Sequence, residues 1–293
     1  MVDDLKRNMP LDDLSPILIT GANGYLGRSL MTTFRGRGLP VLGVARKPSG
    51  PHCDFVADLR HSDALEDALA SLSLSRIVHA AAVVPKTNAD YANAAAAEEN
   101  AIMAQNVANY AQSKNVPLIL VSSMTVYSAA ATNPVVEDNM IGKPGSAYAV
   151  AKRRAEAICR YTGVTGFAAR IPGLFGGDRA DGLVANVKRA LKSGDNLVLP
   201  GEPVQWAAMH VQDAADAIAE LCQIRAMTFQ AVNVGYEGPM SISRLYSIAC
   251  ELFGRETDHT VDHPDFEFDL HRWKSLTGQS PKRFHDVLEG YLT

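Results

Sequence analysis

The amino-acid sequence predicts an α/β protein with a doubly wound parallel sheet and a smaller mixed α/β lobe at the C-terminal end. Three observations lead to this prediction. Short apolar runs alternate with segments of helical spacing up to Ile171. A glycine-rich turn follows the first of these runs. Beyond Pro172 glycine and proline become frequent and the regular alternation ends.

The strands are predicted from short apolar runs. In order, they cover Ile17–Thr20, Val41–Val44, Phe55–Asp58, Arg76–Ala82, Leu118–Ser122 and Gly166–Ile171. Helical spacing between them predicts helices at Tyr25–Arg37, around leucines 65, 69 and 72, at 91–114 and at Ala147–Tyr161. Strands that alternate with helices form parallel sheets, so we expect helices on both faces.

The change of pattern after Pro172 suggests how the chain divides. We expect a flexible leader over residues 1–15, because this acidic stretch has no apolar signal core. Residues 16–172 with about 209–235 are expected to form the sheet domain. A helix at Ala214–Cys222 and a strand at Ala231–Val234 would return the chain to the sheet. Residues from about 173–208 with 236–293 are expected to form the lobe.

Composition limits the possible partners. The 293 residues are 47% hydrophobic and carry a net charge of -4, which gives no reason to expect a nucleic acid partner. No apolar run reaches the length of a membrane helix, so we expect no membrane partner. The four cysteines have no C-x-x-C spacing. A reducing, cytoplasmic setting is therefore expected.

The glycine-rich turn has the spacing of a phosphate-binding turn. Gly21 would allow a tight turn, Gly24 would let the backbone approach a pyrophosphate, and Gly27 would let the helix pack closely. The pattern alone also fits an ordinary turn, but here it follows a strand and opens a helix. We expect a dinucleotide to be bound by Gly21, Asn23, Gly24, Tyr25, Leu26 and Gly27.

The end of the second predicted strand favours NADP over NAD. NAD sites usually have an acidic residue there, whereas this chain has Ala45 followed by Arg46 and Lys47. Basic side chains can pair with a 2′-phosphate, although two solvated loop cations would look the same. Asp58, next to Leu59, could accept a hydrogen bond from the adenine amino group, or it could cap the following helix.

A tyrosine and a lysine four residues apart predict the catalytic pair. Tyr148 and Lys152 would share one helix face, and a nearby ammonium would lower the pKa of the phenol. The tyrosine could then exchange a proton with a substrate oxygen. Ser123 ends the fifth predicted strand, where ligands bind in open α/β sheets, and could orient that oxygen.

Five motifs in order carry a resemblance to a known family. They are TGANGYLG, VHAAA at 78–82, SSMTVY at 122–127, YAVAK at 148–152 and RIPGLFG at 170–176. From residue 16 to about 290 the chain resembles the extended short-chain dehydrogenase/reductase superfamily, in its NAD(P)-dependent epimerase/dehydratase branch of nucleotide-sugar enzymes. The resemblance implies a Rossmann-type domain, a smaller substrate domain and catalytic Ser123, Tyr148 and Lys152. It also implies cofactor contacts from Ala80, Ala81, Ala82 and Ile171.

Two residues after Ser123 indicate the reaction type. Dehydratases of this branch have acidic residues at the places of Met124 and Thr125, so a 4,6-dehydratase is not expected. The segment resembles epimerases and also ketoreductases. Arg46 favours an NADPH-using ketoreductase that acts on a keto sugar nucleotide. An NAD-dependent epimerase with a transient keto intermediate stays open, and so does a non-catalytic NADP-binding regulatory module.

The substrate contacts depart from the family pattern. Sugar-nucleotide members often have asparagine at Gly173 and arginine at Trp206. Trp206 could stack on a base or sugar, or belong to the core, and Arg179 could supply positive charge. With Val84 and Thr125 these residues are the expected substrate contacts. A smaller carbonyl compound or a sugar lactone stays possible.

Two further expectations concern assembly and metals. The family resemblance suggests a homodimer built from residues 91–114 and 147–161. His259 and His263 have metal-like spacing, but no convincing third ligand accompanies them, so no metal site is expected.

Overall fold

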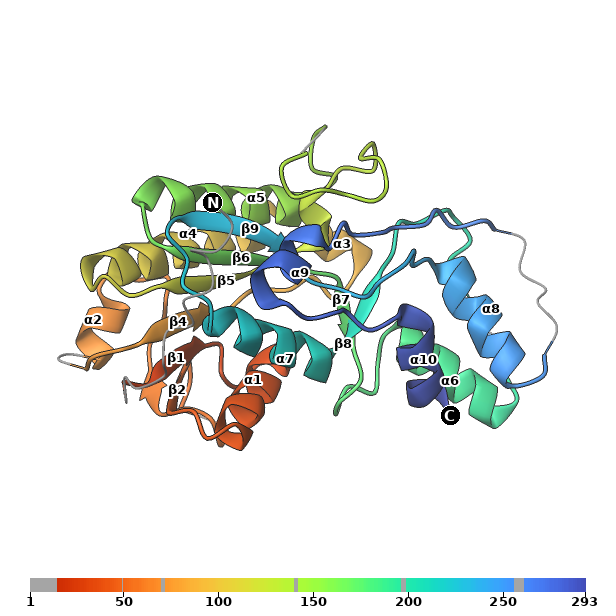
Figure 1. Cartoon of the computed structure of the whole chain (residues 1–293), viewed down its shortest axis with the longest axis horizontal. Coiled ribbons are helices and arrows are strands. Elements are labelled where there is room, and N and C mark those ends of the chain that lie inside the picture. The colour runs from red at the N-terminus through yellow and green to blue at the C-terminus, as the bar shows by residue number, and fades with distance from the viewer. Residues whose placement is uncertain (1–14, 49, 70–71, 140–141, 196–198, 256–260) are drawn as a thin grey trace.

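The computed structural model describes residues 15–48, 50–69, 72–139, 142–195, 199–255 and 261–293. All of the expected leader except Ser15 therefore lies outside the described residues. The central feature is a sheet with the strand order β3-β2-β1-β4-β5-β6-β9, in which every neighbouring pair is parallel (Figure 1). The predicted α/β class, with a doubly wound parallel sheet and a smaller C-terminal region, is confirmed.

The strands lie close to their predicted positions. They are β1 Ile17–Thr20, β2 Val41–Ala45, β3 Phe55–Val56, β4 Arg76–His79, β5 Leu118–Ser123, β6 Gly166–Ile171 and β9 Phe229–Asn233. Strand order reverses between β1 and β4, and a ligand crevice is expected at the carboxyl ends of strands at such a point.

Helices cover both faces of the sheet. On one side lie α1 Tyr25–Gly36 and α7 Val211–Cys222, and on the other α4 Ala94–Ser113 and α5 Ala147–Thr162 (Figure 1). Alternate strand residues supply the two cores: Ile17 and Ile19 pack on the α1 side, whereas Leu18 packs on the α4 side. This alternation is the period of two that β-strands impose on side chains.

Strand β4 is shorter than predicted, because it ends at His79 and not at Ala82. The backbone beyond it bonds to side chains instead of a neighbouring strand. Ala81 N donates to the Thr20 hydroxyl, and the Asn100 side chain bonds both the N–H and the C=O of Val83. The expected helix over 91–114 is likewise divided, into α3 Asn88–Tyr91 and α4, because the Asn93 side chain caps a new helix start.

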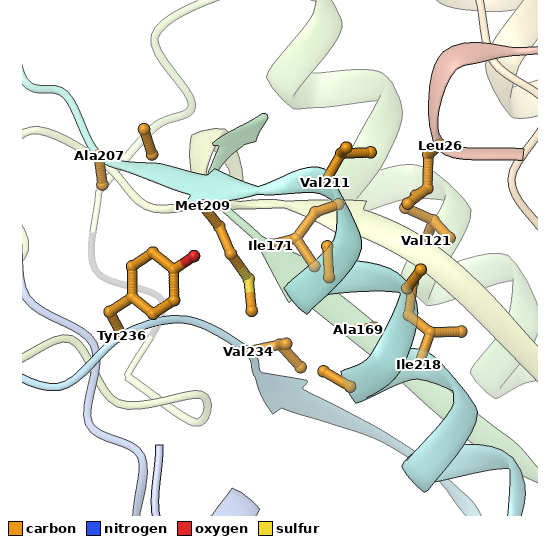
Figure 2. Packing of buried hydrophobic residues seen from close by; sticks show 14 of the residues in the cluster. Leu26, Val121, Ala169, Ile171, Ala207, Met209, Val211, Ile218, Val234 and Tyr236 are labelled. Carbon is orange, nitrogen blue, oxygen red and sulfur yellow. The ribbon is translucent and has the colours of Figure 1, made fainter. Parts of the chain in front are cut away.

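The C-terminal region joins the sheet through a continuous core. The small strands β7 Gly173–Phe175 and β8 Ala208–His210 pair in parallel. Its helices are α6 Leu183–Ser193, α8 Ile242–Leu252, α9 His271–Thr277 and α10 Phe284–Leu292. Figure 2 shows Ile171 of β6, Met209 of β8, Ile218 of α7 and Val234 in one apolar cluster. This shared core fixes the C-terminal helices relative to the sheet.

The domain boundaries stay a prediction. Helix α7 begins three residues before the expected Ala214, and β9 begins two residues before Ala231. Arg272 of α9 donates to the Ala231 carbonyl of β9. Helix α9, which lies within the range expected for the lobe, therefore contacts the sheet itself.

Candidate functional site

A cavity of about 1230 Å³ lies at the carboxyl ends of the central strands. It is larger than the roughly 300–1,000 Å³ of common ligand pockets, so it has room for a dinucleotide and a second molecule. Every residue that the sequence indicated as a site residue lines it: Gly21, Asn23, Gly24, Tyr25, Leu26, Gly27, Arg46, Lys47, Asp58, Leu59, Ala80, Ala81, Ala82, Val84, Ser123, Thr125, Tyr148, Lys152, Ile171, Gly173, Arg179 and Trp206. The structure brings all of these positions together, and their individual roles stay predictions.

The glycine-rich turn forms one end of the cavity. Gly21 has φ +71°, and a Cβ there would lie 2.7 Å from the Ala81 Cα atom. A Cβ on Gly27 would lie 2.0 Å from the Gly21 carbonyl oxygen. Both positions therefore require glycine.

Helix α1 begins directly after this turn with no side-chain cap and no acidic residue in its first turn. Its first N–H groups and the positive end of its dipole are left to interact with an anion. Two features of the chain itself, an uncapped helix start and a backbone without Cβ atoms, suit a pyrophosphate.

Arg46 and Lys47 follow β2 at the edge of the cavity, and both are exposed. Within the described part of the chain neither makes a hydrogen bond or an ion pair. Both cations are therefore available for an anionic group of a ligand.

Asp58 does not cap a helix. Helix α2 begins only at Ala64, so that alternative is wrong. The Asp58 carboxylate instead accepts hydrogen bonds from Nε and Nη2 of the Arg60 guanidinium, which lowers the pKa of Asp58 to about 2. Asp58 also lines the cavity, and its contact with an adenine amino group stays a prediction.

Ser123 and the pair Tyr148 and Lys152 all line the cavity. Ser123 ends β5, and its hydroxyl oxygen accepts hydrogen bonds from the N–H and the hydroxyl of Thr125. Helix α5 begins at Ala147, capped by the Ser146 side chain, so that Tyr148 and Lys152 lie one turn apart on the same face. Lys152 Nζ donates to the Val121 carbonyl, 2.8 Å away, and lies 5.7 Å from the centroid of the Tyr148 ring.

The expected lowering of the Tyr148 pKa by Lys152 is not found. Burial raises the pKa of the phenol, and Tyr91, whose ring meets that of Tyr148 edge-on at 5.9 Å, adds to the rise. Burial also lowers the pKa of Lys152 to about 8. Both shifts have the same cause, since low-dielectric surroundings disfavour the phenolate and the ammonium alike.

The expected substrate residues line the same cavity and form what is called its substrate end. Arg179 bonds to Asp181, and its guanidinium lies 5.5 Å from the centroid of the Tyr25 ring. Trp206 is half-buried and meets Phe284 edge-on at 6.1 Å while it also lines the cavity. It therefore combines the two alternatives, core packing and access to a ligand.

Gly173 and the exposed Val84 also line the cavity. A Cβ on Gly173 would lie 3.2 Å from the Ala207 carbonyl oxygen, which accepts a hydrogen bond from Gly173 N. Val84 follows Val83, whose backbone is held by Asn100.

Sequence reasoning missed several residues of the site. Asn100 holds the backbone beside the cavity, Tyr91 packs on Tyr148, and Arg28 lines the cavity while it pairs with Asp178. Asn100 is one of three asparagines in helix α4, so no signal in the sequence singled it out. The partners of Tyr91 and Arg28 lie too far along the chain for spacing to reveal them.

The described residues include neither a metal-ligating cluster nor a membrane-spanning helix. No group of three metal-ligating side chains occurs among the residues that the structure describes. His259 lies outside them, and His263 is buried, with Nδ1 accepting a hydrogen bond from Val204 N. No described helix is long and apolar enough to cross a membrane.

Comparison with known proteins identifies the family. The chain belongs to the NAD dependent epimerase/dehydratase family, whose model matches residues 17–235. The expected membership is confirmed. The GDP-L-fucose synthase of Azorhizobium caulinodans is 26% identical over an alignment of 269 positions that covers 84% of this chain and 83% of that protein.

Two solved structures have the same fold. The UDP-N-acetylglucosamine 4-epimerase from Bacillus cereus superimposes with a TM-score of 0.78 at 19% identity, covering 95% of each chain. The Bordetella bronchiseptica enzyme WbmG, in complex with NAD and UDP, gives a TM-score of 0.76 at 22% identity, covering 94% of this chain and 93% of that one.

Proposed function

We propose that this protein is an NADPH-dependent ketoreductase that acts on a keto sugar nucleotide. One observation carries the proposal: the basic pair Arg46 and Lys47, which no other described residue engages, borders the same cavity as Ser123, Tyr148 and Lys152. A 2′-phosphate gives two such cations a partner, whereas the ribose of NAD favours an acidic residue at this place. The likeness to a GDP-L-fucose synthase supports a nucleotide-sugar substrate.

The chain's own groups fit the cofactor. The uncapped start of α1 and the glycine backbone at Gly21 and Gly27 suit a pyrophosphate. Lys152, which lines the cavity, would hold the ribose next to the nicotinamide. Bound NADPH would supply the hydride that the ketone carbon accepts.

Tyr148 would then protonate the ketone oxygen. Burial raises the pKa of its phenol, so the group is protonated at neutral pH, which is the form a reduction needs. The hydroxyl of Ser123 accepts from Thr125 and keeps its own proton to donate to the same oxygen. The ketone gains a hydride and a proton and becomes an alcohol, and the Tyr148 phenolate regains its proton from solvent.

An epimerase is the second candidate. The same three residues would oxidise and re-reduce the sugar with a tightly held NAD and no net use of cofactor. Two similar folds, a 4-epimerase and an NAD complex, favour this alternative. A non-catalytic NADP-binding regulatory module is the third, and the intact set of Ser123, Tyr148 and Lys152 argues against it.

Further predictions concern the reaction type, the assembly and the location of the protein. Met124 and Thr125 carry no acidic group for an elimination, so we propose that the protein is not a 4,6-dehydratase. The homodimer through α4 and α5, the cytoplasmic location and the absence of nucleic acid and membrane partners stay predictions.

The first test is the reaction itself. We expect purified protein without retained cofactor to oxidise NADPH when a keto sugar nucleotide is added, with simpler ketones and lactones as the comparison panel. Retained NAD with interconversion of epimers and no net NADPH use would instead establish the epimerase. Cofactor binding without either reaction would establish the regulatory module.

A further inference from the structure

Helix α5 carries a buried carboxylate that the proposed reaction does not use. Glu156 lies four residues after Lys152 and eight after Tyr148, on the same helix face. It is 3% exposed and lies outside the cavity. A buried charge needs a partner and hydrogen bonds to be tolerated, so its contacts indicate what it does.

The Glu156 carboxylate joins the helix to two strands. Its Oε1 accepts from the Ser122 hydroxyl at 2.5 Å and from Arg170 Nε at 3.0 Å, and its Oε2 accepts from Arg170 Nη2 at 2.6 Å. Arg170 is 2% exposed, so the pair is shielded from water. Ser122 and Arg170 are register partners on β5 and β6, and they directly precede Ser123 and Ile171.

A second bond joins the same helix to the same strand. Lys152 Nζ donates to the carbonyl of Val121, the residue before Ser122. Two successive turns of α5 are thus bonded to two successive residues of β5. Ser123 follows Ser122 on that strand. These bonds therefore fix the position of Lys152 and Tyr148 along β5 relative to the Ser123 hydroxyl.

The charges around Lys152 give Glu156 an electrostatic role as well. Tyr148 and Glu156 face it from α5, and β5 contributes a carbonyl and the Ser122 hydroxyl. His79 faces it from β4 and is neutral, because burial lowers its pKa to about 3. Arg170 of β6 is paired with the Glu156 carboxylate. Among the described residues facing Lys152, Glu156 alone is an anion, and it opposes the effect of burial on the ammonium.

We propose that Glu156, held by Arg170, is a positioning residue that keeps Lys152 and Tyr148 level with Ser123 and keeps the Lys152 amine protonated. The inference rests on the proposed roles of these three residues. An ion pair with a purely structural role would contribute to stability and leave turnover and the Lys152 titration unchanged.

Two single variants test the proposal. Glu156→Gln is expected to move the Lys152 titration about one pH unit lower, whereas Arg170→Met is expected to move it higher, because the carboxylate is then no longer neutralised. The titration is followed by NMR of protein with isotope-labelled lysine and assigned with Lys152→Met. Glu66→Gln, which removes the exposed partner of Lys114, is the matched control and leaves the Lys152 titration unchanged.

Loss of one member of a buried pair also destabilises a fold, so the double variant Glu156→Leu/Arg170→Met separates position from stability. We expect it to unfold near the wild-type temperature and yet to lose about 100-fold in kcat, with the KM for NADPH unchanged. Ser122→Ala keeps the ion pair and is expected to lower kcat about 5-fold without moving the Lys152 titration.

Two outcomes overturn the inference: a Lys152 titration that stays in place in both single variants, or a stable double variant with wild-type kcat. The titration needs neither substrate nor cofactor. If the wild-type protein reduces no ketone, the proposed function fails while the titration still reports on Glu156.

Discussion

The two ends of the cavity are built differently. The cofactor end is formed by strand ends and one tight turn, in which backbone atoms touch: Gly27 leaves no room for a Cβ against the Gly21 carbonyl. The substrate end includes segments far apart in sequence, held by side-chain contacts such as that of Trp206 with Phe284. Substitutions at the cofactor end are therefore expected to disrupt the fold. Substitutions at the substrate end can change specificity with little loss of stability.

The largest effect is expected where the two ends meet. Tyr148→Phe removes the proposed acid and is expected to lower kcat by about 10²- to 10⁴-fold while NADPH binding is unchanged. Steady-state kinetics and a cofactor titration measure the two quantities. Tyr161→Phe, which removes the hydroxyl of an exposed tyrosine on the same helix outside the cavity, is the control and stays near wild-type activity. Near wild-type turnover in Tyr148→Phe would remove the tyrosine from the mechanism.

We expect the buried Lys152, which the proposed reaction needs, to lower the free energy of unfolding. Its pKa is lowered by burial from 10.5 to about 8, so the folded state binds that proton more weakly than the unfolded state. Below pH 8 this difference lowers the stability of the folded state by about 3 kcal/mol. The loss of stability shrinks as the pH rises and vanishes above about pH 10.5. We expect Lys152→Met to be inactive and more resistant to urea at pH 7, with an advantage that disappears at high pH. Equal urea midpoints at pH 7 would contradict this.

A methyl group at the turn tests the rigidity of the cofactor end. Gly27→Ala is expected to destabilise the protein by about 1–3 kcal/mol and to weaken NADPH binding, because its Cβ would overlap the Gly21 carbonyl. Gly36→Ala has no atom within 4 Å of the added Cβ and serves as the control. Urea unfolding compares the two, and equal stabilities would show that the turn is looser than described.

The smallest effect is expected at the substrate end. Trp206→Ala should raise the substrate KM about 3- to 10-fold and leave the Kd for NADPH unchanged. Trp206→Phe keeps an aromatic ring against Phe284 and should recover most of the loss. A change in NADPH affinity would mean that the two ends are coupled.

The same contrast explains what the sequence could predict. The positions of the strands, the glycine turn and the Tyr148–Lys152 face follow from local patterns, because spacing within one turn or strand fixes them. The residues that line the substrate end were reached only through the family resemblance. The contacts of Arg179 and Trp206 there depend on segments that meet only in the folded chain.

Burial caused the clearest failure of sequence reasoning. The lowered pKa expected for Tyr148 assumed a charged neighbour in a polar setting, whereas desolvation dominates in the folded protein. The partner of Glu156, Arg170, lies 14 residues further on, beyond any helical spacing. Neither effect can be read from a motif.

The most direct test of the central claim compares NADPH and NADH binding to the wild type and to Arg46→Ala/Lys47→Ala, followed by nicotinamide fluorescence. The account predicts that the wild type binds NADPH about 10- to 100-fold more tightly, and that the double variant loses this preference while its NADH affinity is unchanged. Arg160→Ala, an exposed cation outside the cavity, should change neither affinity. Tightly retained NAD with no preference for NADPH in the wild type would contradict the account and make the epimerase the leading function.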